Sequence, residues 1–257
     1  MTQKKLPRLS ARLMAVADLV SPGMRLADVG TDHAFLPIYL VASGKIPSAI
    51  AMDVREGPLS RAKEHIAGWK MTDQIEARLS DGLTALKPGE ADCLVLAGMG
   101  GMLVIRILSE QPLVRESLKE IIVQPQSDLP AVRHFFHELD WTELAEDMVQ
   151  EEGKYYPMMK MGRRQTRTAA PVQAPAFAEG LEDSLPDQKT VLAERFGGLL
   201  LAAGHPVLLE YLKREREITA RIRKQLEGTQ TPSACARLKQ VEEDWQLIEA
   251  ALKEYYD

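Results

Sequence analysis

Short apolar runs alternate with amphipathic stretches over residues 6–161. The first five runs are nearly continuous in hydrophobic residues, which is typical of parallel strands buried on both faces. These runs cover 25–29, 49–53, 75–79, 91–97 and 120–124, and helical spacing lies at 6–20, 58–69 and 102–109. Strands that alternate with helices predict an α/β fold, with helices on both faces of a mostly parallel sheet.

Two more strand patterns, 142–149 and 155–161, follow at the end of this region. The short polar segment between them, residues 150–154, is typical of a hairpin, which makes the last strand antiparallel to its neighbour. We therefore expect a seven-stranded sheet that is mostly parallel and ends with an antiparallel strand.

The periodic pattern is lost between residues 163 and 187 and returns beyond them. A basic start, an Ala/Pro-rich middle and an acidic end predict a linker or mobile loop at 163–187. Thr231 and Pro232 have the residue types of a helix N-cap and first turn, and they separate two helical patterns. We expect one domain at 1–162 and a second at 188–257, which contains a coiled-coil helical hairpin. Its predicted seams contain Leu208, Tyr211, Ile218, Ile222 and Leu226, then Leu238, Val241, Trp245, Ile248, Leu252 and Tyr255.

The turn after the first predicted strand carries the most informative residues of the chain. In α/β folds, nucleotide-like ligands bind at the carboxyl ends of strands, and Gly30 lets a ligand approach the backbone. The turn lacks the second and third glycines of the G-x-G-x-x-G sequence that binds a pyrophosphate. Its acidic character suits a cationic or zwitterionic ligand, which indicates S-adenosylmethionine instead of a dinucleotide. The candidate cofactor-binding residues of this turn are Asp28, Gly30, Thr31, Asp32 and His33.

Acidic or glycine-rich turns also follow the next three predicted strands. Asp53, with Val54 beside it, ends the second strand, where a carboxylate either binds ribose hydroxyls or caps a turn. Asp81 and Gly82 follow the third strand, either beside an adenine amino group or in an ordinary tight turn. The segment 98–101, Gly-Met-Gly-Gly, follows the fourth strand, where the glycines let cofactor and substrate approach closely. These turns are therefore candidates for the rest of one ligand site.

Amide and basic side chains are consistent with a nucleic-acid substrate. Gln124 and Gln126 end the fifth strand, where their amides either hydrogen-bond a nucleobase edge or cap the next helix. Basic residues gather near the N-terminus, at 160–167 and at 213–224, although each cluster is also typical of a solvated surface. The candidate substrate-binding residues are Arg8, Arg12, Gly101, Gln124, Gln126 and Tyr156.

Composition argues against several other classes of protein. Cys93 and Cys235 have no disulfide or metal spacing, and no set of His, Cys and carboxylate residues has it either, so we expect no metal. No apolar run reaches the roughly 18 residues of a membrane span, and the N-terminus lacks the apolar segment of a secretory signal. We therefore expect a cytoplasmic protein that does not bind membranes. The net charge of −5 argues against non-specific coating of nucleic acid.

Several segments, in the same order along the chain, resemble the bacterial tRNA (adenine(22)-N1)-methyltransferase family. They are ADVGTDHAFLPIYL (27–40), AMDVREGPL (51–59), LSDGL (79–83), LAGMGG (96–101), VQPQS (123–127), EEGKYYPMMKM (151–161) and the later segment 196–215. Residues 165–187 have no counterpart in the family pattern. The resemblance implies a Class I methyltransferase domain with a C-terminal coiled coil. Such a protein uses S-adenosylmethionine to methylate N1 of an adenine in the tRNA D-arm.

The resemblance also implies a role for the residues of each strand-end turn. The amino-acid end of the cofactor would contact Asp28, Gly30, Asp32 and His33, its ribose Asp53, and its adenine Asp81 and Gly82. The methyl group and the target base would lie against Gly98, Met99, Gly100 and Gly101. Asp32 either stabilises the cationic product or holds the methionine ammonium. With Gly98, Met99 and Gly100 it forms the candidate catalytic set.

Two other functions remain compatible with these patterns. A small-molecule methyltransferase would have the same fold but act without RNA. A non-catalytic RNA-binding or coiled-coil protein would keep the α/β domain as a scaffold. An NAD-dependent dehydrogenase is disfavoured by the missing glycines and by the terminal strand hairpin. The coiled coil either clamps tRNA or mediates assembly, and the sequence is compatible with a monomer.

Overall fold

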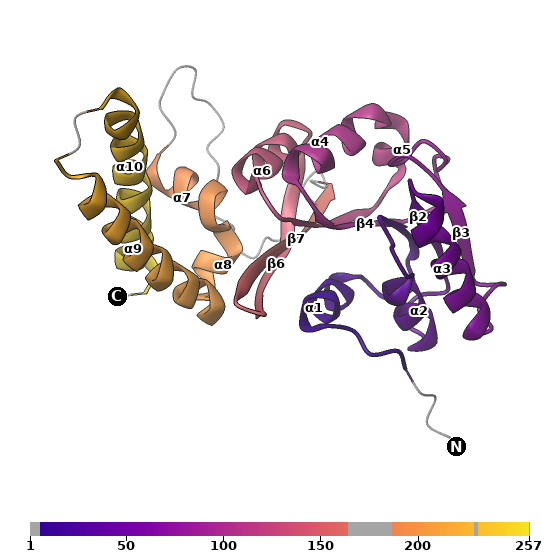
Figure 1. The fold of residues 1–257 in the computed structure, drawn as a ribbon. Helices are drawn as coiled ribbons and strands as arrows, with labels where there is room; N and C mark the ends of the chain where they lie inside the picture. Colours follow the sequence, from indigo (N-terminus) through magenta and orange to yellow (C-terminus); the bar gives the residue numbers. More distant parts are fainter. Residues whose placement is uncertain (1–5, 164–186, 229–230, 257) are drawn as a thin grey trace. The chain divides into compact units, whose positions relative to one another are not determined.

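The computed structural model describes residues 6–163, 187–228 and 231–256. These residues fall into two compact units, one within Met1–Ala170 and the other within Pro171–Asp257. In the described residues, the first unit contains strands and helices, whereas the second contains helices alone (Figure 1). Of the predicted linker 163–187, only its two end residues are described, so the linker stays a prediction. The basic residues Lys4, Lys5, Arg164 and Arg167 also lie outside the described residues.

A sheet of seven described strands forms the middle of the first unit. Its strands are β1 (Arg25–Val29), β2 (Ser48–Asp53), β3 (Ile75–Leu79), β4 (Cys93–Met99), β5 (Glu120–Pro125), β6 (Trp141–Glu151) and β7 (Lys154–Arg163). The strand order is β3-β2-β1-β4-β5-β7-β6, and β1 to β5 are parallel. β7 is antiparallel to both of its neighbours. The predicted sheet is therefore confirmed, and its antiparallel strand is the last along the chain but second from the edge.

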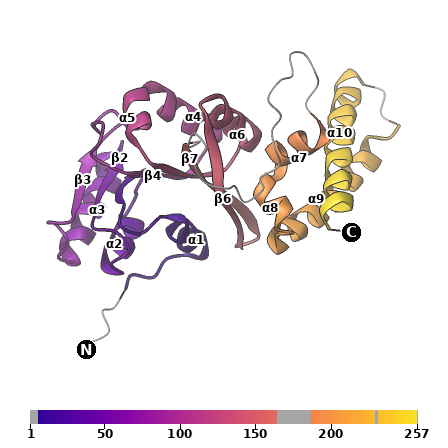
Figure 2. The same cartoon turned by 180° about the vertical axis from the view of Figure 1, so that it is seen from behind.

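Helices cover both faces of this sheet. The described helices are α1 (Ala11–Leu19), α2 (Phe35–Ala42), α3 (Glu56–Gly68), α4 (Gly101–Glu110), α5 (Pro112–Ser117) and α6 (Leu129–Glu138). Figures 1 and 2 show α1 to α3 on one face and α4 to α6 on the other. One core cluster includes Val16, Ile38 and Ile66, and the other includes Leu108 and Phe136. Because both faces are covered, the central strands must be apolar on both sides, which explains their continuous apolar runs.

The first helix is shorter than predicted. Helical spacing suggested residues 6–20, but α1 begins at Ala11 because Ser10 caps it. The Ser10 hydroxyl accepts a hydrogen bond from the Leu13 N–H at 3.3 Å. Leu6, which the spacing placed on the buried face, is 38% exposed and precedes the helix. The prediction was wrong here because apolar spacing continues past the residue that caps the helix.

The hairpin between β6 and β7 is tighter than the predicted loop 150–154. Glu151 pairs with Lys154, so Glu152 and Gly153 alone form the turn. Their φ angles are 50° and 75°. Two successive positive φ angles are typical of a type I′ turn, whose twist matches that of the two strands.

The second unit is helical throughout its described residues. Its helices are α7 (Gln188–Phe196), α8 (Gly198–Ala202), α9 (Pro206–Leu226) and α10 (Pro232–Tyr255). The Thr231 hydroxyl accepts a hydrogen bond from the Ala234 N–H at 3.3 Å, and Pro232 is the first residue of α10, as predicted. α9 and α10 pack against each other as a helical hairpin.

The buried seam agrees with the predicted one on α10, where Val241, Ile248 and Leu252 are buried, and departs from it beyond Leu208 on α9. Tyr211 and Ile218 are half-buried, whereas the neighbouring Leu212 and Thr219 are buried. Leu208, Leu212 and Thr219 follow a single heptad line along α9. Apolar residues of α9 lie on both sides of these buried positions, so the sequence is compatible with two seams on this helix, and tertiary packing determines which one is buried.

Candidate functional site

The carboxyl ends of β1 to β5 lie along one edge of the sheet, and the candidate residues lie in the turns that follow these strands. β1 and β4 are neighbours, with β2 and β3 on one side and β5 on the other. This reversal of strand order is the position at which α/β folds bind ligands. The register pairs Asp53 with Leu79 and Ala97 with Gln124, so neighbouring strands end at similar levels. The topology therefore brings the predicted turns into one site.

Asp28 is a buried carboxylate at the end of β1. It is 5% exposed, and the Thr31 hydroxyl donates a hydrogen bond to its Oδ2 at 2.6 Å. The N–H groups of Gly30 and Thr31 both bond the Met52 carbonyl, at 2.9 and 3.0 Å, which ties the turn to β2. Burial raises the pKa of Asp28 to about 6, and the charge of Asp53 raises it further while the Thr31 hydrogen bond opposes the shift. The carboxylates of Asp28 and Asp53 are both buried and close enough to repel each other, so a cationic ligand would be favourable at this turn.

Asp32 lies in the same turn but is exposed to solvent. Its φ of 51° turns the chain sharply, and its carboxylate lies 3.5 Å from Nε2 of His33 and 3.8 Å from Nη2 of Arg61. Arg61 comes from α3 and was missed by the sequence analysis, because a single arginine on an amphipathic helix gives no local signal. Asp32 therefore has two cationic or titratable neighbours in addition to any ligand.

A stack of aromatic rings supports the turn beside Asp32. The rings of His33, Phe35 and His65 form a mutual cluster, with the His33 centroid 5.4 Å from each of the other two and those two 5.1 Å apart. Nδ1 of His65 lies 3.0 Å from the His33 carbonyl oxygen. Nδ1 of His33 is buried and has no hydrogen-bond partner among the described residues. His65, from α3, thus packs against the turn that carries Asp32.

Asp53 ends β2 beside the buried Asp28. It is 5% exposed, and its Oδ1 accepts a hydrogen bond from the Arg55 N–H at 2.9 Å. The alternative role as a turn acid is therefore real, but it uses a single carboxylate oxygen. Val54 is 58% exposed next to it, so an apolar side chain lines the ligand side of this turn.

Asp81 and Gly82, the two candidate residues in the turn after β3, have different environments. Asp81 is exposed and forms an ion pair with Nη2 of Arg106, on α4, at 3.2 Å. Gly82 is buried with a φ of 55°, and a Cβ there would lie 3.0 Å from Cγ1 of Ile107. Packing against α4 thus accounts for Gly82, whereas Asp81 remains accessible.

The segment 98–101 connects β4 to α4 through a bulge. Gly98 has a φ of 80° at the irregular pairing between Ala97 and Met99. Cε of Met99 lies 3.4 Å from the Cβ position of Gly30, so the turns after β1 and β4 touch. A Cβ at Gly101 would overlap the Ser127 carbonyl oxygen and lie 2.9 Å from Cγ2 of Val132.

Gly100 caps α4 and lies against the loop after β5. Its Cβ position is 3.3 Å from Oγ of Ser127, and that hydroxyl oxygen accepts a hydrogen bond from the Gly101 N–H at 3.3 Å. Close packing therefore explains the two glycines at the start of α4, whereas Met99 contacts the turn after β1.

Residues from three distant segments meet beside Gly98. Nη1 of Arg12, on α1, donates a hydrogen bond to Oε1 of Gln124 at 3.0 Å. The same guanidinium lies over the ring of Tyr156, on β7, 5.6 Å from its centroid. Nη1 of Arg12 is 3.5 Å from the Cβ position of Gly98, and Nε2 of Gln126 is 3.9 Å from it. The structure thus brings together four of the six predicted substrate-binding residues.

The remaining two predicted substrate-binding residues lie elsewhere. Arg8 is exposed before α1, and no contact ties it to this cluster in the part of the chain described. Gly101 belongs to the packed start of α4.

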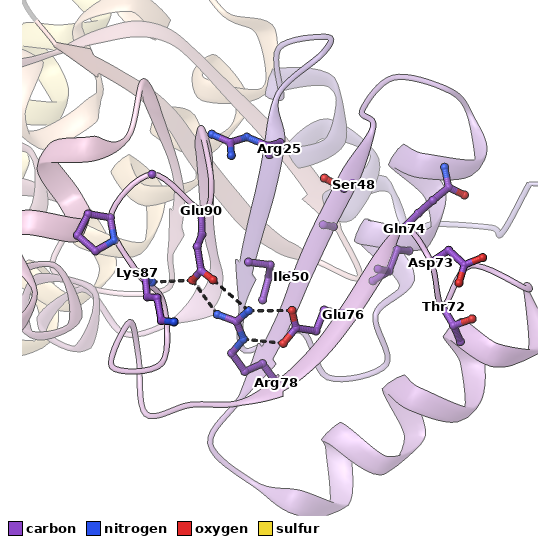
Figure 3. A pocket seen from close by; sticks show the side chains of 14 residues that line it. Arg25, Ser48, Ile50, Thr72, Asp73, Gln74, Glu76, Arg78, Lys87 and Glu90 are labelled. Carbon is purple, nitrogen blue, oxygen red and sulfur yellow. Dashed lines mark hydrogen bonds and ion pairs between the residues drawn. The ribbon is translucent and has the colours of Figure 1, made fainter.

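A separate open groove of about 710 Å³ lies at the opposite, amino ends of β1, β2 and β3 (Figure 3). Its lining includes Arg25 and Gln74, and its most prominent cation, Arg78, is paired with Glu76 and Glu90 at 2.8 Å each. The groove has no access to the turns after the strands and is not the candidate site.

The described residues contain no group of three His, Cys, Asp or Glu side chains that could hold a metal ion. None of the described helices combines the length and apolar character needed to cross a bilayer.

The fold and the acidic turns at the reversal of strand order define a Rossmann-like methyltransferase. The model of the family described as Methyltransferase domain matches residues 9–159. The chain belongs to this family, and the predicted fold class is confirmed.

Individual relatives support the comparison in more detail. The tRNA (adenine(22)-N(1))-methyltransferase of Bacillus subtilis (strain 168) is 34% identical over 152 residues, which make up 59% of this chain and 64% of that protein. The matched part thus spans less than two thirds of this relative's length.

Two solved structures are similar to nearly the whole chain. The B. subtilis m1A22 tRNA methyltransferase TrmK has a TM-score of 0.77 at 26% identity, with 96% of this chain and 99% of that chain covered. Sp1610 of Streptococcus pneumoniae, in complex with S-adenosyl-L-methionine, has a TM-score of 0.77 at 29% identity, with coverage of 95% and 100%.

Proposed function

We propose that this protein is an S-adenosylmethionine-dependent tRNA methyltransferase that methylates N1 of adenine 22 in the D-arm. The observation that carries the proposal is the pair of acidic turns after β1 and β2, beside the reversal of strand order, in a chain similar along its length to the m1A22 methyltransferase TrmK. The tRNA substrate also implies that the enzyme acts in the cytoplasm.

The residues at the strand ends fit S-adenosylmethionine. Asp28 and Asp53 are buried carboxylates that suit a ligand with a sulfonium and an ammonium group, and the free oxygen of Asp53 suits a ribose hydroxyl. Gly30, with a φ of 74°, has no Cβ that would exclude the ligand. Val54 and Asp81 would contact the adenine ring and its amino group. When bound, the cofactor supplies an electrophilic methyl group.

The chain's own contribution to the reaction is positioning and electrostatic. Adenine N1 has a free lone pair only when the base is unpaired, so the base must leave the RNA helix. We place that base beside the bulge at Gly98, next to Met99 and Arg12. Because Gly98 has no side chain, Arg12 and Gln126 come close to the backbone there: a Cβ would lie 3.5 Å from Nη1 of Arg12 and 3.9 Å from Nε2 of Gln126. The methylated base is a cation, and the exposed carboxylate of Asp32 is our candidate for stabilising its charge. His33 would hold the turn that carries Asp32 through its ring stack.

Mapping the methylated nucleotide tests this function directly. Purified protein is incubated with unmodified tRNA and S-adenosylmethionine labelled at the methyl group, and position and atom are identified by primer extension and nucleoside analysis. We expect N1-methyladenosine at position 22, and none in a tRNA with guanine at that position. The variant Asp53→Ala should lose cofactor binding and activity. Methylation elsewhere in the tRNA, or of small molecules alone, would overturn the assignment.

The role of the helical unit stays a separate proposal. We propose that it clamps the tRNA, since α9 carries the basic residues of 213–224. A chain that lacks 205–257 should retain affinity for S-adenosylmethionine and lose affinity for tRNA. Unaltered tRNA affinity would instead favour a role in assembly.

A further inference from the structure

The two glutamines that end β5 have opposite environments, although the sequence treats them as a pair. Gln124 is fully buried, its Oε1 accepts the hydrogen bond from Arg12, and its Nε2 lies 3.4 Å from the Pro125 carbonyl oxygen. Its donor and acceptor are both directed at the protein. Gln126 is exposed, and its side-chain amide has no hydrogen-bond partner in the part of the chain that the structure describes.

Gln126 is nevertheless held in a defined position. Its backbone N–H donates a hydrogen bond to the Met99 carbonyl at 2.9 Å, which joins the end of β5 to the bulge of β4. Its Nε2 lies 3.9 Å from the Cβ position of Gly98, where the proposed function places the target base. A free amide is thus fixed at its backbone beside that base position.

The chemistry of N1 methylation limits which edge of adenine the protein can read. N1 lies on the Watson–Crick edge and must face the methyl donor, so a hydrogen bond to it would block the reaction. The Hoogsteen edge remains, with the N6 amino donor and the N7 acceptor. A glutamine amide pairs with both atoms at once, whereas guanine presents two acceptors there.

We propose, on the basis of the proposed function, that Gln126 selects the target adenine through its Hoogsteen edge. Its Oε1 accepts from N6–H and its Nε2 donates to N7. Gln124 does not contact the base and acts as a positioning residue that holds Arg12 over Tyr156. The two amides of one short motif therefore have different functions.

The test compares tRNA carrying adenosine with tRNA carrying 7-deazaadenosine at position 22, prepared by ligation. The deaza base lacks the N7 acceptor but keeps N1 and N6. We expect kcat/KM of the wild-type protein to be about tenfold lower on the deaza tRNA, within the range for loss of part of a bidentate contact. For Gln126→Ala, the kcat/KM values on the two tRNAs should agree within about twofold. The deaza base can also change the reactivity of N1 itself, but that change affects both proteins equally. It therefore cancels when the adenosine-to-deaza ratio of kcat/KM is compared between the wild type and Gln126→Ala.

Three further variants distinguish recognition of the Hoogsteen edge from effects on the structure. Gln126→Glu keeps the acceptor for N6–H but loses the donor to N7, so it should show no preference for adenosine over the deaza base. Gln124→Ala should lower activity on both tRNAs and retain the tenfold preference. Gln74→Ala, which removes an exposed amide in the groove at the opposite end of the strands, should behave as wild type.

The outcomes distinguish this inference from the proposed function. A deaza penalty that persists in Gln126→Ala, or its absence in the wild type, would overturn the role of Gln126 while methylation of adenine 22 stands. No methylation of adenine 22 by the wild-type protein would overturn the proposed function, and the inference with it.

Discussion

Replacing Asp28 with asparagine should stabilise the protein at neutral pH, although Asp28 belongs to the candidate cofactor site. The side chain is buried, and burial is the main cause that raises its pKa to about 6. At pH 7 the protein must therefore keep a carboxylate ionised in a position that favours the neutral form. Asparagine has nearly the same shape, can still accept the Thr31 hydrogen bond, and carries no charge.

The pKa of Asp28 sets the size and the pH window of this effect. The ordinary value is 3.8 and the folded value about 6, which corresponds to about 3 kcal/mol between the two protonation states. Because the folded pKa is raised, the contribution of Asp28 to stability is fully present below pH 3.8 and is lost as the pH rises through 6. The advantage of Asp28→Asn should thus be near zero at pH 4 and reach at most about 3 kcal/mol above pH 7. The amide N–H groups need acceptors, which lowers the gain.

Urea unfolding of both proteins between pH 4.5 and 8 measures the effect. The difference in free energy of unfolding should grow with pH, chiefly between about pH 4 and 6, and level off above pH 7. Asp18→Asn is the matched control, because it removes an exposed carboxylate from α1. A difference that does not change with pH would refute the reasoning. Asp28→Asn should also bind S-adenosylmethionine more weakly, because a charge that serves a binding site often lowers the stability of the fold.

Two further predictions concern packing and buried charge. Gly101→Ala should destabilise the protein by about 1–3 kcal/mol in urea unfolding, because its Cβ would overlap the loop after β5. The control Gly153→Ala, in an open turn, should cost about 1 kcal/mol. Equal losses of stability in the two variants would contradict this explanation. Arg133→Met should cost about 3–5 kcal/mol, since it removes a cation that lies 2.7 Å from the buried carboxylate of Glu146. Adding Glu146→Leu to Arg133→Met should restore most of that stability, and an unrecovered loss would show that packing dominates.

The sequence predicted the sheet well because burial on both faces leaves a clear pattern. The runs that became β1 and β5 are apolar at successive positions, Leu26–Ala27 and Ile121–Val123, since both faces of the sheet are covered. The insertion of β7 between β5 and β6 could not be derived in the same way. Strand order depends on which edges pair in space, and a hairpin can dock by either of its strands.

The site was predictable where a residue's position along its strand determines its position in space. Asp28 and Asp53 end neighbouring parallel strands, so the sequence alone placed them at one edge. Arg61 and Arg106 reach the site from helix faces, and no local signal distinguishes them from other surface arginines. The contact of Arg12 with Gln124 joins residues 112 positions apart, and tertiary packing alone creates it.

Under the proposed function, electrostatics explain why the first turn departs from G-x-G-x-x-G. A pyrophosphate needs free N–H groups and a positive potential at a helix N-terminus. The carboxylates of Asp28 and Asp53 instead make this position negative, which attracts a sulfonium and an ammonium and repels a diphosphate.

The opposite charge lies on the other side of the Gly98 bulge. There the guanidinium of Arg12 lies beside the position of the target base. Methyl transfer moves positive charge from the acidic side toward Arg12, which opposes the reaction unless an anion neutralises the guanidinium. The phosphates of an RNA substrate supply that anion. A polyanionic substrate is then part of the catalytic electrostatics, which is a physical reason to expect activity on tRNA and little on free adenosine.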